Sequence, residues 1–341
     1  MKDFFINEVK DTAEKIKALK KEGCFCFNVL TDSHIYPPYP QWLERQYNTF
    51  ENLRAVNQAA KCDAVFHLGD LGWTNGTQEA ISFWNQENLE KWFSVFRTEL
   101  LKANQHTFFI AGNHDNLKCG EPNRAEWFKM MVEPMKDRIT GVAENEPYFY
   151  VDFPQHKTRA IALMSNYRED GHKNYGIYKP QVDWLVSRAL RAPDDWSILL
   201  FSHIYPKNSD IDSSVQDNTE EFAGLMWAFK NHKNFESAAF SGDFRNFSSA
   251  KIEAMFVGHG HVDWIAKPGF LPFPVVETAA NHVHVPDRSN WRMPDDCSVP
   301  PREYGTVTED LWDTVIFNPK ERRIDIVRFG AGEDRKLILE D

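Results

Sequence analysis

Seven residues of types that bind divalent metals stand at or just after the ends of short apolar runs. They are three carboxylate or amide residues and four histidines: Asp32, His34, Asp70, Asn113, His203, His259 and His261. Carboxylate, amide oxygen and imidazole groups suit Mn, Fe, Zn or Ni, and none of the seven is a cysteine. We therefore interpret them as the ligands of a site for two divalent metal ions.

The apolar runs that precede these residues have the length and composition of buried β-strands. They cover residues 24–30, 64–66, 107–110, 196–201 and 254–257. Continuous apolar strands are typical of a sheet covered on both faces. The site of such a sheet lies outside the carboxyl ends of its strands, where all five polar clusters fall.

Between the runs the apolar spacing changes to that of helices. It does so at residues 43–53 and 81–100, and again after Pro180, which suits the first turn of a helix. Strands and helices in alternation predict an α/β layered domain.

The spacing within the clusters also fits a metal site. One residue separates Asp32 from His34, and Gly260 alone separates His259 from His261. A glycine there lets the backbone approach closely, as crowding around an ion requires. A lone His-x-His would be weak support for a metal site, whereas five clusters that coincide with five strand ends are strong support for one.

The ordered set resembles the motif series of the calcineurin-like metallophosphoesterase superfamily. The matching motifs are Asp-x-His at 32–34, Gly-Asp at 69–70, Gly-Asn-His-Asp at 112–115, a single His203, and Gly-His-x-His at 258–261. The resemblance spans roughly residues 24 to 280. It implies a layered α-β-β-α sandwich with active-site loops at the strand carboxyl ends.

The resemblance also implies a role for each residue. Asp32, His34 and His261 would hold one ion, and Asn113, His203 and His259 would hold the other, with Asp70 bridging the two. In this family a metal-bound hydroxide attacks phosphorus in line, as two closely spaced ions allow. His114 would protonate the leaving oxygen or steady the transition state, and Asp115 would orient His114.

Departures from related groups narrow the expected reaction. Purple acid phosphatases have a tyrosine where this chain has Trp73, and the segment 69–76 lacks the arginine and aspartate of Ser/Thr protein phosphatases. The closer likeness is to bacterial phosphodiesterase branches, which predicts a phosphodiesterase acting on a small substrate. Three alternatives are a phosphomonoesterase (phosphatase), a nuclease and a non-catalytic binding module of the same fold.

Two observations weigh on these alternatives. The formal net charge of −11 argues against nucleic acid as the main partner, because binding a polyanion depends on Lys and Arg. The full ligand set and His114 argue against a binding module.

Seven further residues near the motifs are candidate substrate contacts: Tyr36, Trp73, Asn166, His282, His284, Arg288 and Arg292. Each has a plainer interpretation. The two aromatic residues could pack, the histidines could bond loop backbone, and the arginines could be solvated loop charges.

The 341 residues are predicted to form a single domain, because any cut between Asp32 and His261 would dismantle the site. We expect an N-terminal helix at 1–22, insertions at about 116–146, 204–247 and 281–305, and a C-terminal hairpin at 311–330 that completes a sheet edge. The first insertion should form a helix beside the active-site mouth.

The remaining sequence features concern location. Five cysteines form no CxxC pair and no even framework, which fits a reducing compartment. No signal peptide and no run of about 18 apolar residues is found. We expect a cytoplasmic protein with no membrane partner, while the oligomeric state stays open.

Overall fold

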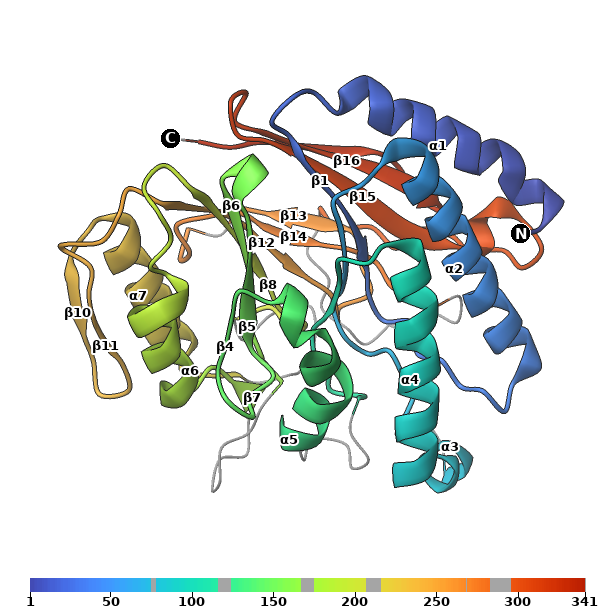
Figure 1. Cartoon of the computed structure of the whole chain (residues 1–341), viewed down its shortest axis with the longest axis horizontal. Coiled ribbons are helices and arrows are strands. Elements are labelled where there is room, and N and C mark those ends of the chain that lie inside the picture. Colours follow the sequence, from blue (N-terminus) through green and yellow to red (C-terminus); the bar gives the residue numbers. More distant parts are fainter. Residues whose placement is uncertain are drawn as a thin grey trace.

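Two large β-sheets lie face to face in the middle of the molecule, and helices cover the outer face of each (Figure 1). The computed structural model describes residues 1–74, 78–115, 124–166, 175–206, 216–267, 269–282 and 296–340. The predicted four-layer α-β-β-α sandwich is confirmed.

The first sheet carries the first three motifs. Its six strands run in the order β17 (Arg335–Ile338), β16 (Arg323–Gly330), β15 (Leu311–Asn318), β1 (Phe25–Leu30), β2 (Ala64–His67) and β3 (Thr107–Phe109). Strands β1, β2 and β3 are parallel, so their carboxyl ends reach the same edge. Strands β15 and β16 occupy the predicted hairpin, but β17 pairs outside β16, so the expectation that this hairpin forms the sheet edge was wrong.

The second sheet carries the last two motifs. Its seven strands run in the order β13 (Trp264–Ala266), β14 (Val275–Glu277), β12 (Lys251–Val257), β8 (Ser197–Phe201), β6 (Thr158–Ala162), β5 (Phe149–Phe153) and β4 (Gly141–Val142). Strands β14, β12, β8 and β6 are parallel. Two small ladders lie outside the sheets, β7 (Tyr175–Gly176) with β9 (Gln216–Asp217) and β10 (Asn234–Glu236) with β11 (Ser241–Asp243).

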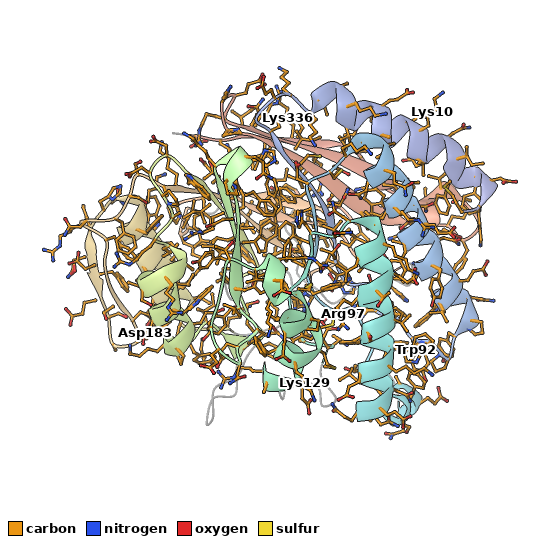
Figure 2. The ribbon with its side chains drawn as sticks, in the orientation of Figure 1. Lys10, Trp92, Arg97, Lys129, Asp183 and Lys336 are labelled. Carbon is orange, nitrogen blue, oxygen red and sulfur yellow. The ribbon has the colours of Figure 1, made fainter. Side chains whose placement is uncertain are left out.

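Aromatic rings from both sheets join the two layers, and side chains fill the space between them (Figure 2). Phe66 of the first sheet stacks on Phe201 of the second, with ring centroids 4.0 Å apart. Phe27 meets Phe256 edge to face at 5.3 Å. Such pairs contribute beyond the area they bury, so they fix how the sheets sit against each other.

Seven α-helices are described: α1 (Ile6–Leu19), α2 (Pro40–Ala60), α3 (Gln78–Phe83), α4 (Gln86–Ala103), α5 (Arg124–Trp127), α6 (Lys179–Trp184) and α7 (Thr219–Lys230). Shorter helical turns cover Asp3–Phe5, Phe128–Val132, Glu133–Arg138, Pro154–His156, Leu185–Ala189 and Val307–Glu309. In Figure 1 the helices α1, α2 and α4 cover the first sheet, while α6 and α7 lie on the side of the second.

Most predicted helices have a counterpart. Helix α1 lies within the range 1–22, and the insertion at 116–146 contains α5 and two helical turns. The apolar spacing at 81–100 does not give one helix, because the side chain of Asn85 accepts a hydrogen bond from the amide of Asn88 and starts α4 there. None of the helices in these described ranges combines the length and apolar character that a membrane crossing requires.

Candidate metal centre

All seven predicted ligands come together where the carboxyl ends of the two sheets meet. Asp32 and His34 follow β1, Asp70 follows β2 and Asn113 follows β3, while His203 follows β8 and the pair His259 and His261 follows β12. The side chains that meet there come from both sheets. The site therefore exists only because the two sheets pack against each other.

Asp32, His34 and His261 form the first group. Oδ1 of Asp32 lies 3.1 Å from Nε2 of His261 and 3.8 Å from Nε2 of His34, and the two imidazole nitrogens are 3.2 Å apart. Oδ1 of Asp32 is buried and accepts no hydrogen bond from any residue that the structure describes. An unsatisfied buried carboxylate oxygen facing two imidazoles fits a cation held between them.

The rest of the Asp32 side chain is held in place by neighbouring donors. Its Oδ2 accepts hydrogen bonds from the hydroxyl of Thr31 at 2.7 Å and the amide of His259 at 2.9 Å. Burial raises the pKa of Asp32, but the imidazoles of His261 and His203 outweigh burial and lower the pKa well below its usual range. The carboxylate is therefore ionised.

Asp70, Asn113, His203 and His259 form the second group. Nε2 of His203 lies 3.3 Å from Oδ2 of Asp70 and 3.0 Å from Oδ1 of Asn113. The ring of His259 stands 5.1 Å from that of His203, between centroids, and the ligand atoms of Asp70, His203 and His259 lie within 4.8 Å of one another. This group has the donors of a second ion site.

A backbone contact fixes the ring of His203. Its Nδ1 donates a hydrogen bond of 2.7 Å to the carbonyl of Leu68, which leaves Nε2 facing the oxygens of Asp70 and Asn113. Burial lowers the pKa of His203, but the carboxylates of Asp70 and Asp32 outweigh burial and raise the pKa to about 9. The surroundings of Nε2 thus favour a positive charge at that position.

Asp70 lies between the two groups. Its Oδ2 is 3.3 Å from Nε2 of His203 in the second group and 3.7 Å from Nε2 of His34 in the first. Its Oδ1 accepts a hydrogen bond of 2.7 Å from the amide of His114. Burial raises the pKa of Asp70, but His203 and His114 lower it far below its usual range, so the residue is an anion shared by both groups.

His114 lies beside the same two groups of side chains but is more exposed to solvent. Its Nε2 is 4.0 Å from Oδ2 of Asp70, and its ring meets that of His34 edge to face at 4.9 Å. The side chain is 24% exposed, against 8% for His34 and 11% for His261. Geometry also allows His34, Asp70 and His114 to share an ion, so His114 can serve either as a ligand or as a proton donor to a bound substrate.

Asp115 does not hold the ring of His114, which corrects the expectation from the sequence. Its two oxygens accept hydrogen bonds from the backbone amides of Asp70, Leu71, Gly72 and Gly112, at 2.8–3.1 Å. Nδ1 of His114, the atom that an orienting carboxylate would contact, has no hydrogen-bond partner among the described residues. Asp115 instead ties the loop after β3 to the loop after β2, because four buried amides need an acceptor.

Three of the predicted substrate residues gather beside the first group. The ring of His282 lies 6.0 Å from that of His34 and 4.5 Å from that of Trp42, and Trp42 in turn lies 5.1 Å from Trp73. Tyr36 meets Trp73 at 6.1 Å. Trp42 is not among the candidates from the sequence, and only its place shortly after the first motif could have suggested it.

Of the remaining candidates only Asn166 lies within the described residues, and no hydrogen bond there joins its side chain to the metal groups. Asn166 is buried past the end of β6, where its backbone pairs with Gly176. Its side-chain amide has no hydrogen-bond partner in the part of the chain that the structure describes. His284, Arg288 and Arg292 lie outside the described residues. His67 donates to or accepts from the hydroxyl of Ser33 at 2.9 Å, which fits a supporting role behind the ligands.

Two carboxylate–imidazole groups that share one aspartate define a hydrolase class with a dinuclear metal site. The family model for calcineurin-like phosphoesterases matches residues 27–263, which include all seven ligands. The chain belongs to this family and is a metal-dependent phosphoester hydrolase.

Two solved structures are similar to this chain at low sequence identity, and the first of them has the same fold. A dimetal phosphatase from Danio rerio is 12% identical with a TM-score of 0.56, and the match covers 93% of this chain and 99% of that one. A provisionally assigned 5′-nucleotidase from Staphylococcus aureus is also 12% identical with a TM-score of 0.44, over 93% of this chain and 55% of that one. No curated protein matches the sequence.

Proposed function

We propose that the protein is a phosphodiesterase that hydrolyses small diesters. The observation that carries this proposal is the cluster of aromatic rings, Tyr36, Trp42 and Trp73, that adjoins the first metal group through His282. A diester carries one negative charge and an organic group on each side of phosphorus. Aromatic rings beside the metal groups suit such a substrate better than a dianionic monoester, which usually needs additional Arg or Lys donors.

Each residue of the centre has a role in this proposal. Asp32, His34 and His261 would hold one ion, Asn113, His203 and His259 would hold the other, and Asp70 would bridge them. The ions, drawn from Mn, Fe, Zn or Ni, would supply charge stabilisation at phosphorus and a reactive water at neutral pH. His114 would donate a proton to the leaving oxygen, because its ring is the more exposed one beside Asp70.

The test compares a diester with a monoester on the same preparation. We would strip the protein with a chelator, reload it with Mn²⁺, and measure kcat/KM for bis-p-nitrophenyl phosphate and p-nitrophenyl phosphate. We expect a preference for the diester of more than about tenfold, equal to roughly 1.4 kcal/mol in transition-state stabilisation.

Two controls make the comparison decisive. Asp70→Asn should lose both activities, which excludes a contaminating phosphatase. A preference for the monoester would instead support a phosphatase.

A further inference from the structure

A cavity of about 470 Å³ lies at the end of the second sheet opposite to the metal centre. Its wall comes from the last turns of α7, the first residues of β12, the loop before β14 and the C-terminal residues 338–340. The ligands His259 and His261 follow the other end of β12, which is seven residues long. A strand of that length spans roughly 20 Å, so the cavity is separate from the metal centre.

The cavity is lined largely by apolar side chains. Met226, Trp227 and Phe229 come from α7, and Leu271 and Phe273 come from the facing loop. Trp227 is 39% exposed, although large apolar side chains are usually covered. A volume within about 300–1,000 Å³ and an apolar lining are typical of small-molecule sites.

The polar groups of the cavity give it a positive charge. Four cations line it, Lys230, Lys251, Lys267 and Arg322, against two carboxylates, Glu253 and Glu340, which leaves a net charge of +2. The whole chain has a net charge of −11. A positively charged apolar cavity on an acidic protein attracts anions, whereas the negative charges elsewhere on the protein repel them.

The two carboxylates are already paired. Lys267 Nζ lies 2.9 Å from Glu340, and Arg322 lies 2.6 Å from Glu253. Among the described residues, Lys230 and Lys251 form no ion pair with a carboxylate. Lys230 Nζ lies 5.7 Å from the ring centroid of Trp227 and donates to the carbonyl of Pro272 at 3.4 Å, so an ammonium group stands directly beside the exposed ring.

We propose that this cavity binds a small amphipathic anion, an aromatic or short aliphatic body that carries one carboxylate, sulfonate or phosphate group. The body packs against Trp227, Phe229 and Leu271, and the anionic group lies between Lys230 and Lys251. An apolar wall with a few convergent charges gives both the affinity and the orientation of such a ligand.

The test uses 8-anilino-1-naphthalenesulfonate as the probe and the complete chain as the receptor. The probe should bind at one saturable site, measured by its fluorescence and by calorimetry. The double variant Lys230→Glu with Lys251→Glu should weaken binding at least tenfold. N-phenyl-1-naphthylamine lacks the sulfonate, so its binding should change less than twofold between the two proteins.

The matched control is the double variant Lys91→Glu with Lys10→Glu. Lys91 lies 5.4 Å from the ring centroid of Trp92, as Lys230 lies over Trp227, and Lys10 is exposed on α1. Figure 2 labels Trp92 and Lys10 on α4 and α1, away from α7. This control changes the net charge equally and should alter binding of the probe less than twofold.

Three results would overturn the proposal: no saturable binding, equal weakening in both double variants, or no weakening in either. The unfolding midpoint and the phosphoesterase rate should stay unchanged in all variants. If the glutamate pair fails to fold, Lys230→Gln with Lys251→Gln provides the same comparison with a smaller expected loss, of about fivefold.

Discussion

At the residue scale, the ligands are held in an unusual backbone conformation. Asp32, His34, Asp70, His259 and His261 have φ angles of 51°, 43°, 53°, 69° and 56°. Non-glycine residues rarely adopt the left-handed region, although Asp and His tolerate it better than branched residues. Surrounding bonds, such as the hydrogen bonds of Asp115 to the loop after β2, hold this conformation. The backbone turns sharply after β1, β2 and β12 and presents these five side chains to the shared centre.

His114 offers a prediction at this scale. His114→Ala should lower kcat by about 10²–10⁴-fold, because a positioned proton donor contributes that much. Both ions should remain, since the seven predicted ligands are intact. Elemental analysis and steady-state kinetics check the two expectations, with His106→Ala, an exposed residue, as the control. Loss of an ion would show that His114 is a ligand, and an unchanged rate would remove its assigned role.

At the element scale, the loops that follow the strands must pass very close to one another. A side chain at Gly258 would overlap the hydroxyl of Thr31, and one at Gly112 would overlap the backbone nitrogen and Oδ1 of Asp70. Packing requires glycine at position 112 because the backbone of Asp70 cannot move aside cheaply. It requires glycine at position 258 because the hydroxyl of Thr31 is held there by its hydrogen bond to Asp32. These contacts bring the loop after β3 against the loop after β2, and the loop after β12 against the loop after β1.

Gly112→Ala tests this close approach. The added methyl group should displace Asp70, lower the metal content of the purified protein and destabilise the fold by about 1–3 kcal/mol, as overpacking usually does. Gly269→Ala is the matched control, because nothing lies within 4 Å of a Cβ built at Gly269. Elemental analysis and thermal unfolding compare the two. Equal behaviour of both variants would contradict the packing argument.

At the scale of the whole molecule, a buried ion network joins the two sheets. Arg328 of β16 donates to Asp313 of β15 at 2.8 Å and to Asp263, beside the second sheet, at 2.6 Å. Asp313 also accepts hydrogen bonds from Arg335 of β17 and from Thr278 after β14. Removing one member of such a network leaves the other charged groups buried without a partner.

This network predicts how stability depends on pH. Burial raises the pKa of Asp313, but the guanidinium groups of Arg328 and Arg335 outweigh burial and hold the pKa below its ordinary value. Because the folded-state pKa is lowered, the stabilisation is fully present above the unfolded-state pKa, about 4. It is lost as the pH falls through the folded-state pKa. The free energy of unfolding should therefore fall below about pH 4.

Asp313→Asn tests this dependence. The variant should lose about 3–5 kcal/mol at pH 7 and should show a shallower loss below pH 4, measured by urea unfolding between pH 3 and 7. Asp243→Asn removes an exposed pair with Arg245 and is the control. Parallel pH curves for the wild type and Asp313→Asn would contradict the role of Asp313.

Whether a feature could be predicted from the sequence depends on how far apart in the chain the interacting residues are. The strand ends, the residue types and the order of the motifs are local properties, so the sequence alone predicted the α/β layers and the family. The assignment of the metal ligands stays a prediction. The spacing of residues does not encode individual hydrogen bonds. It therefore did not predict three features: strand β17 outside the hairpin, the break at Asn85 and the partners of Asp115.

Other features depended on contacts between residues far apart in the chain. The sequence placed Asp32 and His261 in one cluster only through a family resemblance, and the packing of two sheets put their side chains 3.1 Å apart. The aromatic neighbours of Trp42 and the positive cavity beneath α7 likewise arise from segments that the fold brings together. The sequence determined which residues could bind metal, and the tertiary structure decided which of them lie close enough to share an ion, because that depends on distances set by the docking of the sheets.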